Sequence, residues 1–147
     1  MKTLTKWIAS FFYIGYMPLA PGTWGSLAGI LWAWFFHDQL LFWTAAFCVL
    51  GFLACRPSQT IFQSKDPSQF VMDEVCGMML SVLWLPKSLL WYGIAFFLFR
   101  LLDVVKPWPI SAIQRNSTPF AIMIDDLLAG VFTNLTLILL IAFFGAR

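Results

Sequence analysis

The sequence is poor in charge and holds a single histidine, and both shortages restrict what the protein can do. Charged residues make up 11% of the 147 residues, against roughly 25% in an average soluble protein. No basic tract alternates with aromatic residues, which excludes nucleic acid as a partner. The one histidine, His37, lies in a short polar turn, so a histidine-rich metal centre and a phosphohistidine reaction are excluded.

Cysteine is also scarce, and its spacing excludes two further kinds of site. Cys48, Cys55 and Cys76 all fall in or beside apolar segments, and no C-x-x-C pair occurs. This pattern is typical of small core residues and indicates neither a disulfide framework nor a zinc site.

Apolar side chains are what the sequence has in abundance, with 61% hydrophobic and 18% aromatic residues. We therefore predict one membrane-embedded domain over residues 1–147, with an all-α, multi-helical membrane bundle as its fold. It should hold about five hydrophobic helices plus a short N-terminal interfacial helix that lies flat on the bilayer. The expected ranges are 1–17 for the interfacial helix, then about 26–36, 40–55, 72–85, 89–105 and 125–144.

Polar residues gather at the ends of these helices, and the course of the chain places many of those ends together. If each of the five helices crosses the bilayer, the polar ends at about 23–26, 56, 73–74, 100–106 and 125–126 share one side. That side then carries seven of the nine cations, and only Lys87 and Arg147 lie on the other. The seven are Lys2, Lys6, Arg56, Lys65, Arg100, Lys106 and Arg115. The positive-inside rule predicts that this side faces the cytoplasm.

Small and polar residues also form stripes along the expected helices. Two stripes have residues at i, i+4 and i+8: Asp73, Gly77 and Ser81, and Asp126, Gly130 and Asn134. Two further pairs are Gly93 and Arg100, seven residues apart, and Gly25 and Gly29, four residues apart. A lipid-facing surface would not select such residues, so we expect these stripes to face the interior of the bundle.

Carboxylates are concentrated at the shared side. Five of the seven acidic residues fall there: Asp73, Glu74, Asp103, Asp125 and Asp126. Such a group is self-repelling unless a cation lies among its members, and with oxygen donors only the natural ions are Mg²⁺ or Mn²⁺. The alternative is that acidic residues in the first turn of a helix merely complement its dipole.

Basic and hydroxyl side chains could supply phosphate binding on the same side. Arg100 and Lys106 flank Asp103 at three-residue spacing, and both suit phosphate oxygens. Thr23 and Ser26 lie in a glycine-containing turn at a helix start, where N–H groups and hydroxyls can face an anion. The alternative for the two cations is that they anchor the helix at the level of the lipid headgroups.

Several phosphatase chemistries lack their motifs in this chain. There is no C-x₅-R loop, no D-x-D pair and no D-G-x₂-A-R pattern of the CDP-alcohol phosphotransferases. The remaining reaction is metal-assisted attack on phosphorus, in which the ion neutralises phosphate charge and helps generate the water nucleophile.

Four motifs then point to a family. They are P-G-T-W-G-S at 21–26, D-P-S-Q-F-V-M-D-E-V-C-G at 66–77, F-R-L-L-D-V-V-K-P-W-P-I at 99–110 and I-M-I-D-D-L-L-A-G at 122–130. In this combination and order, the chain strongly resembles the phosphatidylglycerophosphatase A family. The resemblance implies a multi-pass, Mg²⁺-dependent lipid phosphatase of the bacterial inner membrane, with its active site facing the cytoplasm. Its substrate would be phosphatidylglycerophosphate, converted to phosphatidylglycerol and inorganic phosphate.

The resemblance also implies roles for individual residues. Asp73, Asp103 and Asp126 are the catalytic candidates, and with Glu74 and Asp125 they are the metal-ligand candidates. The substrate-binding candidates are Thr23, Ser26, Arg100 and Lys106. We expect Asp73 or Asp126 to act as base, since each heads an interior stripe, while a covalent aspartyl-phosphate route stays open.

Two alternatives from other classes, and the oligomeric state, also stay open. A small membrane transporter or ion-binding subunit would carry its carboxylates at mid-span, whereas these lie at helix ends. A structural membrane subunit would tolerate neutralisation of Asp73 without a change in lipid composition. A homo-oligomer is compatible with the sequence.

Overall fold

The computed structural model describes residues 2–114 and 118–145, and over these residues it contains helices and connecting turns without strands. The helices are α1 (Lys2–Ala9), η1 (Ile14–Tyr16), α2 (Pro21–Phe35), η2 (His37–Gln39), α3 (Leu40–Phe62), α4 (Met72–Ser81), α5 (Leu89–Val105), α6 (Ile110–Gln114) and α7 (Ala121–Gly145). This confirms the all-α fold and the five hydrophobic helices, here α2, α3, α4, α5 and α7. Arg115 and Arg147, two of the cations used to orient the chain, lie outside the described residues.

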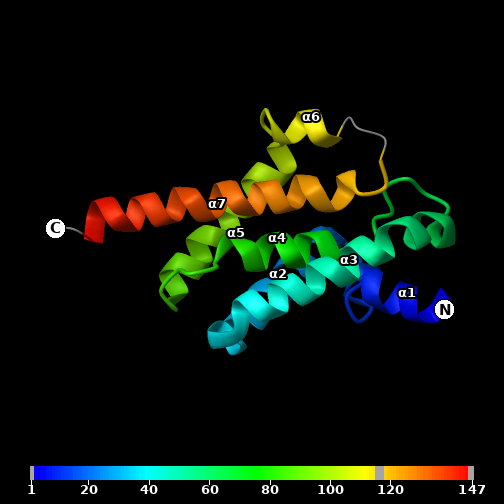
Figure 1. The fold of residues 1–147 in the computed structure, drawn as a ribbon, viewed down its shortest axis with the longest axis horizontal. Helices are drawn as coiled ribbons and strands as arrows, with labels where there is room; N and C mark the ends of the chain where they lie inside the picture. Colours follow the sequence, from blue (N-terminus) through cyan, green and yellow to red (C-terminus); the bar gives the residue numbers. More distant parts are fainter. Residues whose placement is uncertain (1, 115–117, 146–147) are drawn as a thin grey trace.

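The short helix α4 is the centre of the bundle. It packs against α2, α3, α5 and α7, and Figure 1 shows it between α7 and α3. Eight of its ten residues are buried, and at a rise of 1.5 Å per residue it is about 15 Å long. A helix of this length cannot cross a hydrocarbon layer of about 30 Å. The premise that all five helices cross is therefore wrong for α4, which is enclosed by its neighbours instead.

Glycines allow the helices to approach α4 closely. A Cβ atom on Gly130 of α7 would lie 2.5 Å from the carbonyl oxygen of Gly77, and one on Gly77 would lie 2.6 Å from that of Asp126. On α2, a Cβ atom added to Gly29 would lie 2.8 Å from the carbonyl oxygen of Val75. These stripes of small residues face the interior, as the sequence predicts. On α5 the prediction is wrong for Gly93, because a Cβ atom there would meet no described atom within 4 Å, whereas Arg100 of the same stripe lines an interior pocket.

Gly130→Ala should destabilise the protein. The added methyl group meets the backbone of α4, which cannot rotate away, and overpacking of this kind costs roughly 1–3 kcal/mol of unfolding free energy. Thermal unfolding in detergent, followed by circular dichroism, measures the effect. Gly93→Ala is the matched control and should keep or slightly raise the melting temperature, since alanine favours the helix. Equal melting temperatures for the two variants would contradict the close crossing of α4 and α7.

The end of α3 differs from the sequence prediction. The helix was expected to end at Arg56 and Pro57, but it continues through Pro57 to Phe62. A proline removes one N–H donor, which would have bonded the carbonyl oxygen of Leu53, and the neighbouring Ser58 hydroxyl donates to that of Cys55 instead, 2.7 Å away. The last turns also pack against the N-terminal segment, where the rings of Tyr16 and Phe62 lie 6.3 Å apart. Tertiary packing therefore outweighs the proline.

The ends of α4 and α7 also differ. The prediction extended α4 to residue 85, but it ends at Ser81 because Asn134 of α7 donates two hydrogen bonds just there. The Asn134 amide lies 3.1 Å from the carbonyl oxygen of Ser81 and 2.7 Å from that of Leu83. Helix α7 begins at Ala121, one turn before the predicted start. The five-residue helix α6 was expected as loop.

The N-terminal segment is shorter as a helix than predicted. Helix α1 ends at Ala9, and residues 11–13 have positive φ angles that turn the chain back on itself. Ala9 and Phe11 are buried, and the N–H of Val71 donates to the carbonyl oxygen of Ala9 at 2.9 Å. A segment wholly at the lipid interface is therefore wrong, because its turn docks onto the start of α4.

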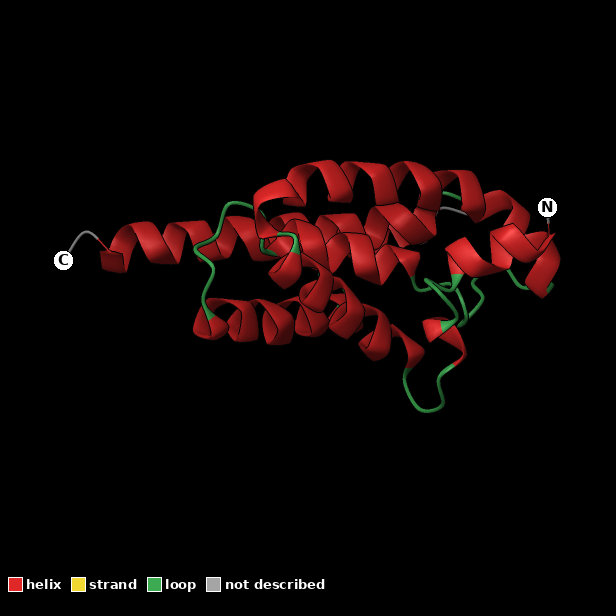
Figure 2. Cartoon of the chain, turned by 90° about the horizontal axis from the view of Figure 1, so that it is seen from below, coloured by secondary structure: helices red, strands yellow, loops and turns green. Residues whose placement is uncertain are grey.

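Two helical segments of the described chain are long and apolar enough to span a membrane. They cover residues 37–62 and 121–144. Apolar side chains on the outside of the bundle are well exposed, among them Leu53, Phe97 and Leu139 at 69–75%. Apolar surface of this extent suits contact with lipid. Figure 2 shows how α7 projects beyond the other helices toward the C-terminus. These features support an all-helical bundle associated with a membrane.

Candidate active site

Five chain segments that are far apart in the sequence meet at one pocket. Its volume is about 640 Å³. It is lined from the start of α2 (Pro21, Gly22), the end of α3 and the following loop (Gln59, Lys65–Ser68, Phe70), the start of α4 (Asp73, Glu74), the end of α5 (Arg100, Asp103, Lys106) and the residues around the start of α7 (Thr118, Ala121, Ile122, Asp125, Asp126). The predicted gathering of polar helix ends is confirmed, although α4 does not span.

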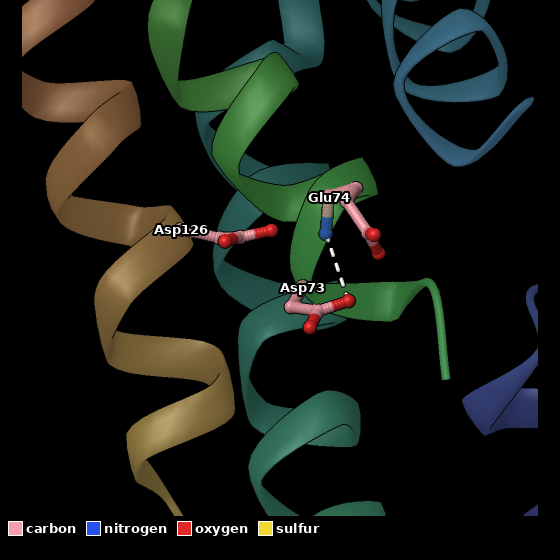
Figure 3. Close-up of side chains that lie close together, drawn as sticks. All are labelled: Asp73, Glu74 and Asp126. Carbon is pink, nitrogen blue, oxygen red and sulfur yellow. Dashed lines mark hydrogen bonds between the residues drawn. The ribbon is translucent and has the colours of Figure 1, made fainter. Parts of the chain in front are cut away.

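Three carboxylates form the core of this pocket. Asp73, Glu74 and Asp126 each offer an oxygen, and these oxygens all lie within 4.8 Å of one another. Figure 3 shows Asp126 reaching from α7 toward the two acidic residues of α4. The N–H of Glu74 donates to the Asp73 carboxylate at 3.0 Å, which fixes the orientation of that side chain at the helix start. The close crossing of α4 and α7 at Gly77 and Gly130 thus brings the three carboxylates together.

The three carboxylates of this cluster repel one another, which favours the binding of a cation among them. Burial raises the pKa of Asp73 well above its usual value, and the neighbouring charges of Glu74 and Asp126 raise it further. The pKa of Glu74 is also raised, chiefly by burial. One oxygen of Glu74, Oε2, is buried and has no hydrogen-bond partner among the described residues. Three hard oxygen donors, one of them unsatisfied, fit a divalent ion such as Mg²⁺.

The other two acidic candidates are held in ion pairs. Arg100 Nη1 lies 2.5 Å from Asp103 Oδ2, within α5. Lys106 Nζ lies 2.5 Å from Asp125 Oδ2, 3.7 Å from Asp103 Oδ1 and 3.9 Å from Asp126 Oδ1. Burial opposes the charged form of Lys106, but the bond to Asp125 and the surrounding carboxylates raise its pKa overall. Asp103 and Asp125 therefore lie beside the three-carboxylate cluster and join it to the two cations.

The two hydroxyl candidates lie apart from this arrangement. Neither Thr23 nor Ser26 lines the pocket. The Ser26 hydroxyl is fully buried and donates to the carbonyl oxygen of Gly22 at 2.9 Å, so it is used within α2. From this turn the structure places Pro21 and Gly22 at the pocket instead.

Comparisons with known proteins show which family the chain belongs to. Residues 7–141 match the model of the phosphatidylglycerophosphatase A family. The chain belongs to this family. Membership makes it an enzyme, a phosphatase. No solved structure matches the chain.

Named relatives support the same assignment. Phosphatidylglycerophosphatase A of Escherichia coli is 34% identical over 90% of this chain and 82% of its own. Phosphatidylglycerophosphatase A of Haemophilus influenzae is 35% identical over 85% of this chain and 81% of its own. A Bacteroides thetaiotaomicron protein, provisionally named a phosphatidylinositol-3-phosphatase, is 37% identical over 86% of each chain.

Two residues that line the pocket, Gly22 and Lys65, were not identified from the sequence as site residues. Gly22 approaches Glu74 so closely that a Cβ atom at position 22 would lie 2.3 Å from Oε1 of that carboxylate. The loop after α3 brings Lys65 to the pocket rim. The motif at 21–26 contains Gly22, but no sequence signal shows which of its residues faces the site. Lys65 precedes the motif at 66–77 and carries no pattern of its own.

Gly22→Ala should impair catalysis more than folding. The added methyl group would displace the flexible end of the Glu74 side chain, and a shift of about 1 Å at a reacting centre can cost about a hundredfold in rate. Phosphate release by the purified variant measures this loss, and its melting temperature should stay close to that of the wild type. Wild-type activity in Gly22→Ala would show that the position of Glu74 is unimportant.

Proposed function

We propose that the protein is a Mg²⁺-dependent phosphatidylglycerophosphatase that releases the terminal phosphate of phosphatidylglycerophosphate. The observation that carries the proposal is the cluster of Asp73, Glu74 and Asp126, whose oxygens lie within 4.8 Å in a pocket that also holds Arg100 and Lys106. A metal-binding carboxylate group beside two cations suits a phosphate monoester. The family and the two bacterial relatives named as phosphatidylglycerophosphatase A support this substrate.

The metal would be held by Asp73, Glu74 and Asp126, and the ion would supply charge neutralisation on the phosphate together with a lowered pKa for the attacking water. Asp103 and Asp125 act differently in this proposal. They orient Arg100 and Lys106, whose remaining N–H donors face the phosphate oxygens. The five acidic candidates thus divide into three ligands, one of which also accepts the water proton, and two positioning residues.

In the reaction, the oxygen of a water molecule forms a bond to phosphorus while the bond from phosphorus to the glycerol oxygen breaks. The water proton passes to a carboxylate, for which Asp73 and Asp126 are the candidates because both lie in the cluster. The glycerol oxygen leaves with the bonding electron pair and takes up the proton that the carboxylate received, so the products are phosphatidylglycerol and inorganic phosphate. Arg100 stabilises the charge on the transferring phosphoryl group.

The acyl chains would stay in the bilayer throughout. The pocket lies at the starts of α2, α4 and α7, and α3 and α7 each include a segment long enough to span a membrane. A site at helix ends places the reacting phosphate at headgroup level. Lysines at positions 2, 6 and 65 belong to the same polar end by sequence, which favours the cytoplasmic face of the bacterial inner membrane.

Phosphate release from phosphatidylglycerophosphate, with and without EDTA, tests the proposal. The purified protein in mixed micelles should release phosphate, lose that activity in EDTA and regain it on addition of excess Mg²⁺. No ion gradient exists in micelles, so activity there also argues against a transporter. Absence of release with Mg²⁺ present would overturn the proposed substrate.

A second candidate substrate is phosphatidylinositol 3-phosphate. The observation that favours it is the Bacteroides thetaiotaomicron relative, which is at 37% identity and is provisionally named for that activity. Both lipids carry a phosphate monoester on a polyol that is joined to the lipid by a phosphodiester. The same assay with this lipid measures the relative preference.

A further inference from the structure

A hydrogen-bonded loop holds Lys65 at the mouth of the pocket. The Gln59 side chain donates to the carbonyl oxygen of Lys65 at 2.6 Å, and the N–H of Ser64 donates to the carbonyl oxygen of Gln59 at 3.2 Å. The loop continues with the N–H of Asp66 donating to the Ser64 hydroxyl at 3.3 Å. These bonds involve the backbone of Lys65, and the residue is exposed and lines the pocket.

Lys65 differs from the other cations of the pocket in having no carboxylate partner among the residues that the structure describes. Three cations line the pocket, and in the described part of the chain Arg100 and Lys106 both form ion pairs whereas Lys65 forms none. Asp66 also lines the pocket, but no ion pair joins it to Lys65 there. A lysine that forms no ion pair with the described residues, on a hydrogen-bonded loop at an acidic pocket, is available to an anionic group of the ligand.

Under the proposed function, the substrate carries two phosphates, a monoester and a phosphodiester, which must bind in different surroundings. The monoester requires the metal cluster, where its bond is broken. The phosphodiester carries a further negative charge that must lie outside the carboxylate cluster, because the six acidic residues lining the pocket would repel it. A cation that lines the pocket outside the three-carboxylate cluster, as Lys65 does, meets that need.

We propose that Lys65 binds the phosphodiester of the substrate and so makes the enzyme selective for lipids with two phosphates on one polyol. This inference rests on the proposed function. In phosphatidylglycerophosphate the two phosphates lie on carbons 1 and 3 of glycerol, and in phosphatidylinositol 3-phosphate they lie on carbons 1 and 3 of the ring. Lys65 would bind the phosphodiester while the metal cluster binds the monoester, so the pair would select lipids with this spacing of phosphates. Phosphatidic acid has only one phosphate and lacks it.

The test compares Lys65→Gln with the wild type on phosphatidylglycerophosphate and on phosphatidic acid, whose single phosphate is the monoester. Loss of a charged hydrogen bond should lower kcat/KM for the first lipid by about tenfold, mainly through KM. The value for phosphatidic acid should not change. Lys65→Arg should restore most of the loss, and Lys87→Gln, an exposed lysine over the Trp34 ring and outside the pocket, is the matched control.

Two outcomes would overturn the inference: equal loss on both lipids, or no loss on either. A wild type that prefers phosphatidic acid would overturn it as well. Failure of the proposed substrate is a separate result. If the wild type ignores phosphatidylglycerophosphate but hydrolyses phosphatidylinositol 3-phosphate, the same comparison is made with that lipid, and a selective loss in Lys65→Gln sustains the inference. If it hydrolyses neither two-phosphate lipid, both proposals fall.

Discussion

Asp126→Asn should lower phosphate release by about a thousandfold, because metal charge stabilisation contributes several kcal/mol and about 1.4 kcal/mol corresponds to tenfold. Asp126 is the one carboxylate of the central cluster that α7 contributes. Asparagine keeps the shape of the side chain but removes the charge that an ion requires. The measurement is kcat with phosphatidylglycerophosphate at saturating Mg²⁺.

The control for this substitution is Asp38→Asn. Asp38 is exposed in η2, outside the residues that line the pocket, and its neutralisation should leave kcat unchanged. The Asp126→Asn protein should also keep its melting temperature or gain slightly, since one buried negative charge is removed from a repelling group. Full activity in both Asp126→Asn and Asp103→Asn would refute the site.

Lys106→Met should cause the second large effect, and it should do so through stability as well as activity. The ammonium group holds Asp125 of α7 to the end of α5, with the Asp125 side chain only 4% exposed. Leaving a buried carboxylate without its partner costs about 3 kcal/mol. We expect a clearly lower melting temperature together with a loss of phosphate release.

A double variant separates the two contributions. In Lys106→Met with Asp125→Asn, the unpaired charge is gone, so most of the melting temperature should return. Activity should stay low, because the cation that we propose binds the substrate phosphate is still missing. Recovery of both properties would mean that Lys106 has only a structural role.

The sequence predicted which charged helix ends meet at the site, although not which residues of the 21–26 turn face it. Helix ends and the direction of the chain brought Asp73, Asp103 and Asp126 together, and the spacing of Gly77 and Gly130 identified the faces that meet. These features depend on local composition and on helical periodicity, which a sequence displays directly.

Features set by tertiary contacts could not be predicted. Proline at position 57 is a strong local signal for a helix end, and only the packing of the last turns of α3 against the N-terminal segment overrides it. Likewise, the end of α4 depends on Asn134, which is more than fifty residues away. The geometry of the loop after α3 also depends on a tertiary contact. No residue pattern indicates that the Gln59 side chain donates a hydrogen bond to the carbonyl oxygen of Lys65.

The central claim is that Asp73, Glu74 and Asp126 share one divalent ion at the meeting point of α4 and α7. Binding of Mn²⁺, followed by electron paramagnetic resonance on the purified protein, tests it most directly. The wild type should bind Mn²⁺ in competition with Mg²⁺, and Asp73→Asn and Asp126→Asn should each lose most of that affinity, whereas Asp38→Asn should retain it. Unchanged Mn²⁺ affinity in both cluster variants would contradict the account.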